Sequence, residues 1–423
     1  MLLKKLLPYA GCILRGRLPG QLIIQMTSRC NATCPQCGMR VSSRFKRSTL
    51  SAERMKRMLD SALSEGVAAV SFTGGEPLLE MDLLIEMLDY AGKAGIEYLR
   101  TGTNGFVFRG PDKPDYKDRI GALASRLAGT SLRNFWISID SHLPQVHEEM
   151  RGFPGIMEGI ERALPVFHGE GLYPAANLGI NRKIGGRETW KLSSDDFHDT
   201  ESYLDEFRRV YSRAFDLFFR RVENMGFTMV NSCYPMSVEG SSEEELNAVY
   251  TASSADRIVK FSRREKAALF EALSNAIKEH RSKIRIFSPL TSLHVLQRSY
   301  SGKATEPYPC RGGIDYFFVD AADGKTYPCG YRGGEDLGYF WELRRSKVRN
   351  CTLCDWECFR DPSELMGLLA PGLAKPGIIM RKMENDPEYF DILLKDLLYY
   401  SACGLFNGRQ PPDLKGMRRT TVD

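Results

Sequence analysis

Short apolar runs alternate with longer amphipathic runs over the first 300 residues of the chain. Six of the short runs are β-rich and do not alternate between apolar and polar residues, a pattern typical of parallel strands that are buried on both faces. These six strands are predicted at residues 21–27, 67–73, 96–102, 134–140, 173–180 and 227–233.

The segments between these strands carry the spacing of amphipathic helices. One helix is predicted over residues 51–65, where Ser51 is a suitable N-cap, and another over residues 78–95, which end at a glycine. Three further helices are predicted at residues 155–171, 196–226 and 255–283.

Six strand–helix units with buried strands predict an α/β fold, a partial (β/α)6 barrel of the TIM type. In such barrels the chemistry gathers at the carboxyl ends of the strands. The polar and cysteine motifs of this chain lie at the ends of its first four strands. A cysteine loop at 30–37, Gly-Gly-Glu at 74–76 and Thr-Asn-Gly at 103–105 follow the first three strands, and Ser-Ile-Asp at 138–140 lies on the fourth.

The pattern changes after residue 300. A polar linker at 301–306 leads into a stretch rich in glycine and cysteine, where a hairpin is predicted at residues 316–319 and 326–329 around the turn Asp323-Gly324. From residue 363 the chain has helical character, most clearly at 387–400.

These changes divide the chain into four expected parts. They are an N-terminal amphipathic segment (1–20), the partial barrel (21–300), a small cysteine-rich domain (301–362) and a C-terminal helical region with a tail (363–423).

Composition and charge restrict the class of protein. Hydrophobic residues make up 43% and charged residues 26% of the 423 residues, which is typical of a globular protein with a sizeable core. The net charge of +5 permits an anionic partner but does not require one. Because Lys and Arg are spread among acidic residues, no nucleic-acid partner is expected.

The eleven cysteines are unevenly distributed. Three form a group near the start of the chain: Cys30, Cys34 and Cys37. Five form a second group near the end: Cys310, Cys329, Cys351, Cys354 and Cys358. The remaining three stand alone and are expected to be ordinary thiols: Cys12, Cys233 and Cys403.

The first group has the spacing of a metal site. Three thiolates within eight residues can surround one cluster, and a cubane of four irons takes four ligands. Three protein ligands therefore leave one iron open to an exogenous group, as a metal centre that performs chemistry requires.

The spacing Cys30-x3-Cys34-x2-Cys37 after a first strand resembles the signature of the radical S-adenosylmethionine (radical SAM) superfamily. Asn31 fits that pattern, whereas Gln36 stands where many members have an aromatic residue. The Gly-Gly-Glu segment Gly74-Gly75-Glu76 after the second strand is similar to the family segment that holds the amino group of the methionine moiety.

Three more residues resemble binding positions of that superfamily. Asn104 lies in a third-strand motif. Ser138 and Arg151 match a pattern whose members contact the carboxylate or ribose of S-adenosylmethionine. The sixth strand lacks the glycine-rich motif of some members, so no adenine contact is assigned there.

The resemblance implies an activity and its cofactors. The expected cofactors are a [4Fe–4S] cluster and S-adenosylmethionine, whose reductive cleavage gives a 5′-deoxyadenosyl radical that abstracts hydrogen from a substrate. The implied reductant is a flavodoxin or ferredoxin, and the implied location is the cytoplasm.

The second cysteine group resembles the SPASM extension or its shorter form, twitch, which implies an auxiliary [4Fe–4S] cluster that transfers electrons. Five cysteines cannot hold two full clusters, so we expect one cluster with four cysteine ligands and one spare cysteine. The favoured ligands are Cys310, Cys329, Cys351 and Cys354, with Cys358 either spare or a substitute. A zinc knuckle is the alternative for this region.

Several alternatives stay open. The substrate can be a small metabolite, a lipid or a peptide, the last disfavoured because only about twenty residues precede the first strand. A non-catalytic iron–sulfur or zinc protein, acting as an electron carrier or scaffold, is the alternative from another class. No catalytic proton acceptor is assigned, and Tyr331 and Arg332 after Cys329 are only candidates.

The N-terminal segment has two interpretations. Residues 1–14 are basic and then apolar, which favours a short helix that caps the bottom of the barrel. The second interpretation is an amphipathic segment that rests on a membrane surface, which would make the protein peripherally membrane-associated. No run is long and apolar enough to span a bilayer.

Overall fold

The computed structural model describes residues 16–38, 47–235, 248–250, 256–303, 308–344, 351–368 and 376–421. Within these residues nine strands form one sheet in the order β7-β6-β5-β4-β3-β2-β1-β8-β9. The strands are β1 Gly20–Thr27, β2 Val67–Gly74, β3 Tyr98–Thr103, β4 Leu132–Ile139, β5 Ala175–Gly179, β6 Met229–Cys233, β7 Arg285–Ile286, β8 Tyr316–Val319 and β9 Thr326–Tyr327.

All neighbouring strands from β7 to β8 pair in parallel, and only the β8–β9 hairpin is antiparallel. The sheet does not close, because β7 and β9 stand at its two ends. The predicted partial α/β barrel is therefore confirmed.

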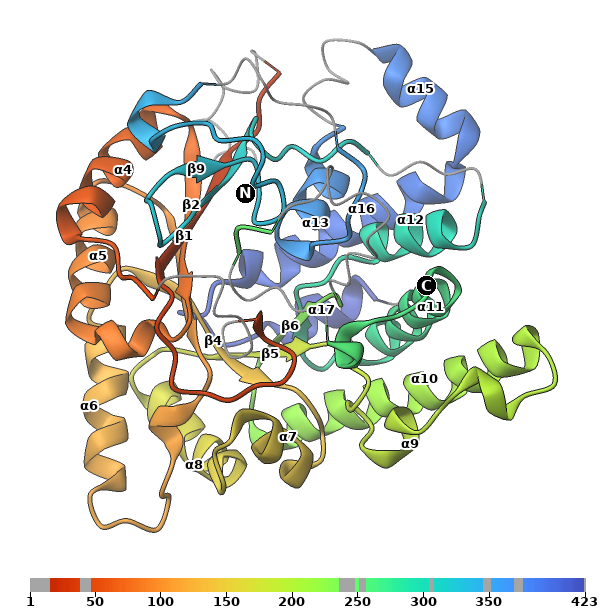
Figure 1. Ribbon diagram of the computed structural model, residues 1–423, viewed down its shortest axis with the longest axis horizontal. Coiled ribbons are helices and arrows are strands. Elements are labelled where there is room, and N and C mark those ends of the chain that lie inside the picture. Colours follow the sequence, from red (N-terminus) through yellow and green to blue (C-terminus); the bar gives the residue numbers. More distant parts are fainter. Residues whose placement is uncertain are drawn as a thin grey trace.

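Helices cover the outer face of the sheet (Figure 1). Those of the barrel are α4 Ala52–Ser64, α5 Met81–Lys93, α6 Tyr116–Ala128, α7 Pro144–Arg151, α8 Ile156–Gly169, α9 Arg187–Trp190, α10 Thr200–Met225, α11 Arg263–His280 and α12 Leu290–Tyr300. Those that follow are α13 Glu357–Met366, α15 Pro376–Asn385, α16 Pro387–Ala402 and α17 Leu414–Arg419. No helix in this described part combines the length and apolar composition that a membrane crossing needs.

The structure differs from the predicted elements in several barrel units. Helices α6, α7, α9 and α12 and strand β7 lie where no element was predicted, and α11 begins at Arg263 rather than at residue 255. The start of α11 is fixed by a capping box, in which the Ser262 hydroxyl accepts from the Glu265 N–H and the Glu265 carboxylate accepts from the Ser262 N–H. Residues 1–15, which include Cys12 and most of the predicted amphipathic segment (1–20), lie outside the described residues.

The predicted hairpin of the cysteine-rich region is present, and it extends the barrel sheet. Residues 21–24 of β1 pair with residues 316–319 of β8, so the segment that carries the second cysteine group is hydrogen-bonded to the first barrel strand. This pairing brings the two cysteine groups to neighbouring parts of the molecule, although nearly 300 residues separate them in the sequence.

Alternate residues of the barrel strands face opposite sides. Leu22, Ile24, Val70 and Phe72 point outward and belong to a hydrophobic core that the surrounding helices complete. The other face is more polar and lines the interior of the barrel, so a site inside the barrel can offer hydrogen bonds.

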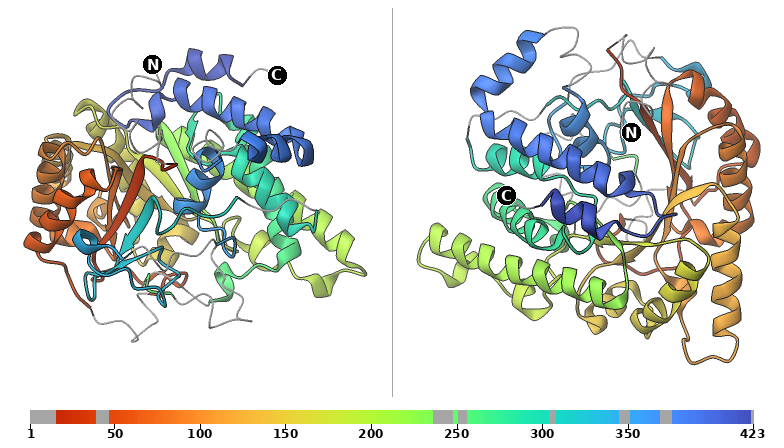
Figure 2. Two further views of the ribbon diagram at one scale, coloured as in Figure 1. Left: turned by 90° about the horizontal axis from the view of Figure 1, so that it is seen from above. Right: turned by 180° about the vertical axis from the view of Figure 1, so that it is seen from behind.

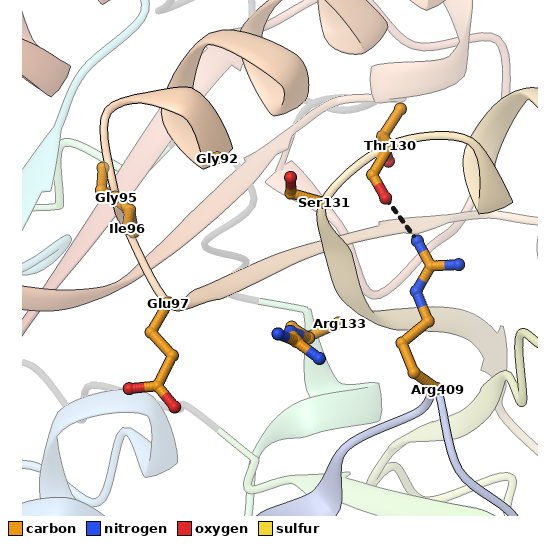
Figure 3. A pocket seen from close by; sticks show the side chains of 8 residues that line it. All are labelled: Gly92, Gly95, Ile96, Glu97, Thr130, Ser131, Arg133 and Arg409. Carbon is orange, nitrogen blue, oxygen red and sulfur yellow. Dashed lines mark hydrogen bonds between the residues drawn. The ribbon is translucent and has the colours of Figure 1, made fainter. Parts of the chain in front are cut away.

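The C-terminal segment closes the amino end of the barrel. Arg409 donates to the backbone carbonyls of Ala128 and Thr130 at 2.9 and 2.7 Å, which places its charge at the carboxyl end of α6 (Figure 3). Gly408 exchanges backbone hydrogen bonds with Arg133 and Tyr173 at the starts of β4 and β5. Helix α16 packs beside α12 (Figure 2), where the Asp396 carboxylate accepts from the Thr291 N–H at 2.8 Å.

Candidate active site

The first cysteine group lies on the loop that follows β1, at the carboxyl end of the strand. No disulfide joins Cys30, Cys34 or Cys37 to another described cysteine, and the Cys37 N–H donates to the Cys34 carbonyl at 3.2 Å. The loop is tied to the next strand, because the Gly75 N–H donates to the Thr27 carbonyl at 2.8 Å. The three sulfurs are thus presented at one edge of the sheet.

Glycines 74 and 75 let the end of β2 approach this loop. A Cβ atom at Gly74 would lie 2.1 Å from the Thr27 carbonyl oxygen, and one at Gly75 would lie 2.1 Å from the Arg29 carbonyl oxygen. No other residue fits either position without moving backbone. The Gly-Gly sequence is therefore required for the contact between the two motifs.

Glu76 is fully buried behind this turn. One carboxylate oxygen accepts from the Leu78 N–H at 3.0 Å, and the other accepts from the Asn104 N–H at 2.6 Å. Burial raises the pKa of Glu76 to about 7, although these two hydrogen bonds act in the opposite direction. The carboxyl group thereby fixes the end of β2 to the end of β3.

Asn104 extends the connection to the cysteine loop. Its side-chain amide donates to the Asn31 side-chain oxygen at 2.9 Å and lies 3.6 Å from the Cys30 sulfur. The predicted third-strand motif therefore orients the first cysteine of the group.

Arg151 brings a positive charge to the same loop. Its guanidinium binds the Asp140 carboxylate through two hydrogen bonds of 2.6 and 2.8 Å, and its carbonyl accepts from the Thr33 N–H at 3.3 Å. Burial alone would raise the pKa of Asp140, but Arg151, together with His147, holds that pKa well below its ordinary value. The pair is ionised, and the charge of Arg151 acts on the thiols of Cys34 and Cys37.

A cavity of about 300 Å³ opens beside these residues. It is lined by all six residues predicted to bind the cofactor and by one cysteine of the first group: Gly74, Gly75, Glu76, Asn104, Ser138, Arg151 and Cys37. The structure thus brings the motifs of four strands together around one space.

Four cysteines of the second group surround a smaller cavity. They are Cys310, Cys329, Cys351 and Cys354. The sulfurs of Cys310 and Cys329 each accept a backbone N–H, from Gly312 and Tyr331 respectively, at 3.4 Å. Four sulfur donors with backbone N–H groups directed at two of them fit a cluster or a tetrahedral metal ion.

Two arginines, Arg332 and Arg360, line the same small cavity. The side chain of Arg360 is 1% exposed, and its guanidinium donates to the Cys354 carbonyl at 3.2 Å. Their positive charges would offset the negative charge that four thiolates bring to a buried site.

Cys358 lies elsewhere. It does not line the small cavity but lines the larger one, beside Glu357 and Cys233. Its thiol donates to the Glu357 carboxylate at 3.4 Å. Trp356 lines both cavities and therefore lies between them.

Sequence reasoning missed much of the cavity wall. The additional lining residues with polar, thiol or aromatic groups include Ser71, Arg100, Trp136, Asn177, Asn231, Cys233, Tyr250, Trp356 and Glu357. One signal was available, because Arg100 is the only charged residue of β3, whose sequence is YLRTGT. Tyr331 and Arg332 were the two candidates for a catalytic proton acceptor. Tyr331 lines the large cavity, and Arg332 lines the small one.

A second hollow, of about 580 Å³, lies at the amino end of the strands (Figure 3). It is lined by residues from the starts of β3 and β4 and by Arg409. It contains none of the cysteine motifs, so the chemistry is assigned to the opposite edge of the sheet.

Residues 24–174 match the family model of the Radical SAM superfamily. This segment of the chain is a radical SAM domain. The match contains the first cysteine group, the Gly-Gly-Glu turn, Asn104, Ser138 and Arg151. Since members of this superfamily are enzymes that use a [4Fe–4S] cluster and S-adenosylmethionine, the predicted enzyme class and these two cofactors are confirmed at the level of the superfamily.

The curated relatives resemble part of the chain. A GTP 3′,8-cyclase of Vibrio parahaemolyticus is 30% identical over 151 residues, which cover 34% of this chain and 42% of the relative. An AdoMet-dependent heme synthase of Oleidesulfovibrio alaskensis is 27% identical over 158 residues, which cover 37% of each chain. The chain thus spans less than half the length of these relatives.

Among solved structures, native anSMEcpe with bound AdoMet is 16% identical with a TM-score of 0.48, over 76% of this chain and 78% of that one. Streptococcus suis SuiB bound to S-adenosylmethionine is also 16% identical, with a TM-score of 0.45, over 74% of this chain and 60% of that one.

Proposed function

We propose that this protein is a radical SAM enzyme whose cluster is held by Cys30, Cys34 and Cys37 and whose substrate enters the 300 Å³ cavity. One observation carries the proposal. The motifs of β2, β3 and β4, together with Cys37 from the loop after β1, line the same cavity.

When bound, the cluster and S-adenosylmethionine supply the reductive cleavage that yields a 5′-deoxyadenosyl radical able to take hydrogen from a substrate. The chain's own residues position these groups. Gly74 and Gly75 leave room at the cysteine loop for a close backbone contact, and Glu76 holds their turn in place. Asn104 orients Cys30 through Asn31.

Ser138 and Arg151 complete the proposed binding residues for S-adenosylmethionine. Both line the cavity on the β4 side, and the Asp140 carboxylate holds the Arg151 guanidinium in one orientation. A fixed cation beside a cavity offers a binding point for a carboxylate, which S-adenosylmethionine carries. Walls of packed strands exclude water from a reaction that bulk solvent would otherwise quench.

The second cysteine site is proposed to hold an auxiliary [4Fe–4S] cluster of the SPASM or twitch type. The support is the donor set, which consists of Cys310, Cys329, Cys351 and Cys354 around one cavity. Trp356 and Tyr331, in contact with each other, lie between this site and the larger cavity. A closed four-cysteine site has no open position, so its role is electron transfer. Cys358 is the spare cysteine.

The proposed partners are a flavodoxin or ferredoxin that delivers the electron, and the substrate. SuiB, one of the solved structures of similar fold, has been captured with its precursor peptide SuiA. A peripheral membrane contact of the N-terminal segment stays a prediction, because that segment lies outside the described residues.

The proposal is tested by anaerobic reconstitution. Iron and sulfide are counted, and 5′-deoxyadenosine is measured after addition of dithionite and S-adenosylmethionine. Wild type is expected to hold about eight irons, whereas the triple variant Cys30→Ala/Cys34→Ala/Cys37→Ala holds about four and forms no 5′-deoxyadenosine.

Cys403→Ala is the matched control, because Cys403 is a buried thiol that lines neither cysteine cavity. Its iron content is expected to equal that of wild type. Continued formation of 5′-deoxyadenosine by the triple variant would contradict the assignment. About four irons together with zinc in wild type would identify the second site as a zinc site instead.

A further inference from the structure

Arg100 occupies an unusual position in the middle of β3. Its side chain lines the interior cavity and lies between two aromatic rings, with the guanidinium carbon 5.5 Å from the centre of the Trp136 ring and 5.3 Å from that of Phe287. These rings hold the guanidinium in place and leave its N–H groups to other partners.

Within the described part of the chain, no ion pair or hydrogen bond involves the Arg100 guanidinium, and its buried Nε has no acceptor. The two acidic residues of the cavity wall have other partners. The Glu357 carboxylate accepts from the Tyr234 N–H and from the Cys358 thiol, and the Glu76 carboxylate accepts from two backbone N–H groups. An enclosed cation without a counter-charge is costly, and a bound anion would remove that cost.

Ser71 supplies a second donor next to it. Ser71 on β2 pairs in register with Arg100 on β3, lines the same cavity, and is 4% exposed. Its hydroxyl also has no hydrogen-bond partner. Two neighbouring buried groups that both lack acceptors indicate that the acceptor comes from a ligand.

The opposite wall of the cavity is polar as well, but its groups satisfy each other. Asn231 on β6 donates to the side-chain oxygen of Asn177 on β5 at 2.7 Å, and the Cys233 thiol donates to the same oxygen at 3.4 Å. Among the described residues that line this cavity, the buried side-chain atoms without a partner are Arg100 Nε, the Ser71 hydroxyl and Gln36 Oε1, and only the first two can donate.

The two donors lie deeper in the barrel than the proposed cofactor residues. Ser71 precedes Gly74 by three residues along β2, and Arg100 precedes Asn104 by four, which corresponds to about 10–13 Å along the strands. A molecule held at Arg100 would extend from the floor of the cavity toward the cluster site.

We propose that Arg100 and Ser71 form an oxyanion subsite that binds a carboxylate or phosphate group of a small substrate and so directs the rest of that molecule toward the cofactor. This inference rests on the proposed function and adds the substrate class to it. The planar guanidinium can donate hydrogen bonds to two oxygens of one anion, and the Ser71 hydroxyl can donate a third hydrogen bond to that anion.

The closed floor of the barrel favours a small molecule. The C-terminal segment covers the amino ends of β4 and β5, where Gly408 bonds to Arg133 and Tyr173. A ligand that reaches Arg100 therefore enters from the cofactor side and ends there.

The test uses the reconstituted holoprotein with S-adenosylmethionine. Tryptophan fluorescence is titrated with inorganic phosphate and, separately, with acetate, while potassium chloride keeps the ionic strength constant. Because Trp136 stacks against Arg100, a saturable change is expected, with a dissociation constant on the order of millimolar. The anion with the lower dissociation constant identifies the substrate group, as a phosphate if inorganic phosphate binds more tightly and as a carboxylate if acetate does.

Arg100→Met is expected to weaken the binding of that anion at least tenfold, Ser71→Ala about threefold, and Arg100→Lys less than Arg100→Met. Arg57→Met is the matched control, since Arg57 is exposed and stacks on Trp341 at 4.0 Å away from the cavity. Its anion binding should equal that of wild type. Iron content verifies that each variant is folded.

Absence of a saturable response to both anions in wild type would overturn the subsite, as would wild-type affinity in Arg100→Met. Failure of the proposed function is distinguishable, because it appears as absence of 5′-deoxyadenosine formation by wild type. Wild type that forms 5′-deoxyadenosine but binds neither anion contradicts the subsite alone.

Discussion

The Glu76 carboxylate accepts a hydrogen bond of 2.6 Å from the backbone N–H of Asn104, which joins two motifs that lie 28 residues apart. Its other oxygen accepts from the Leu78 N–H, so both oxygens are used by the backbone. The shape of the turn therefore depends on both carboxylate oxygens being acceptors, and the Glu76 side chain acts on the cofactor site through the geometry that it fixes.

Glu76→Gln should therefore damage the site although it keeps the size of the side chain. A glutamine must point its NH2 group at one of the two backbone N–H donors, which leaves a buried donor unsatisfied at a cost of about 1–3 kcal/mol. We expect the affinity for S-adenosylmethionine to fall about tenfold or more, measured by equilibrium dialysis with the reconstituted protein.

Glu86→Gln on the exposed side of α5 serves as the control and should bind like wild type. An unchanged affinity in Glu76→Gln would show that the carboxylate does not fix the site.

We predict that the stability of the fold depends on the negative charge of Asp140 in its pair with Arg151. Asp140 has a folded-state pKa below its ordinary value of 3.8, so the stabilisation from the pair is present above that pH and is lost as the pH falls below it. Asp140→Asn leaves Arg151 without its counter-charge, and we expect a loss of about 3–5 kcal/mol that is constant from pH 5 to pH 8.

Thermal unfolding under anaerobic conditions at several pH values measures this difference. Asp82→Asn breaks the pair of Asp82 with Arg126, whose side chains are 94% and 47% exposed, and should cost only a few tenths of a kcal/mol. If the two variants lose similar stability, the Asp140–Arg151 pair does not have the proposed strength.

The strands and the first cysteine site could be predicted from the sequence because both depend on local patterns. Short β-rich runs that do not alternate between apolar and polar residues define the six longer barrel strands, and the spacing of Cys30, Cys34 and Cys37 restricts them to one loop. The Gly-Gly-Glu turn could be predicted for the same reason, since Gly74 and Gly75 are needed where the end of β2 closely approaches the cysteine loop.

Other features depend on contacts between distant segments. The role of Arg100 follows from the curvature of the sheet, which decides that this residue faces the interior of the barrel. The pairing of β8 with β1 joins residues that are nearly 300 positions apart and leaves no local signal. The α11 start was placed too early because the apolar spacing continues upstream of the Ser262 cap.

Gly75→Ala should prevent assembly of the cofactor site. The added Cβ would lie 2.1 Å from the Arg29 carbonyl oxygen and 2.9 Å from the Cys30 Cβ, so the cysteine loop has to move. We expect the loss of about four irons and of 5′-deoxyadenosine formation, measured by iron analysis and product assay.

Gly121→Ala on α6 is the matched control, because a Cβ there meets no atom within 4 Å. It should keep its iron and gain up to about 1 kcal/mol of stability from helix propensity. Full iron content in Gly75→Ala would mean that the loop tolerates the side chain and that the close approach is not required.

The two neighbouring cysteines Cys354 and Cys358 should differ in their effect on the second site. Cys354 lines the small cavity together with three other cysteines and with Arg360, whereas Cys358 begins the first turn of α13 and faces the large cavity. Cys354→Ala is expected to lose about four irons, whereas Cys358→Ala keeps about eight.

Iron analysis combined with Mössbauer spectroscopy separates loss of a cluster from its degradation to a smaller one. A Cys358→Ala variant that loses a whole cluster would identify Cys358 as a ligand and would require α13 to turn in the loaded protein. Equal retention of iron by both variants would exclude a four-cysteine cluster at this position.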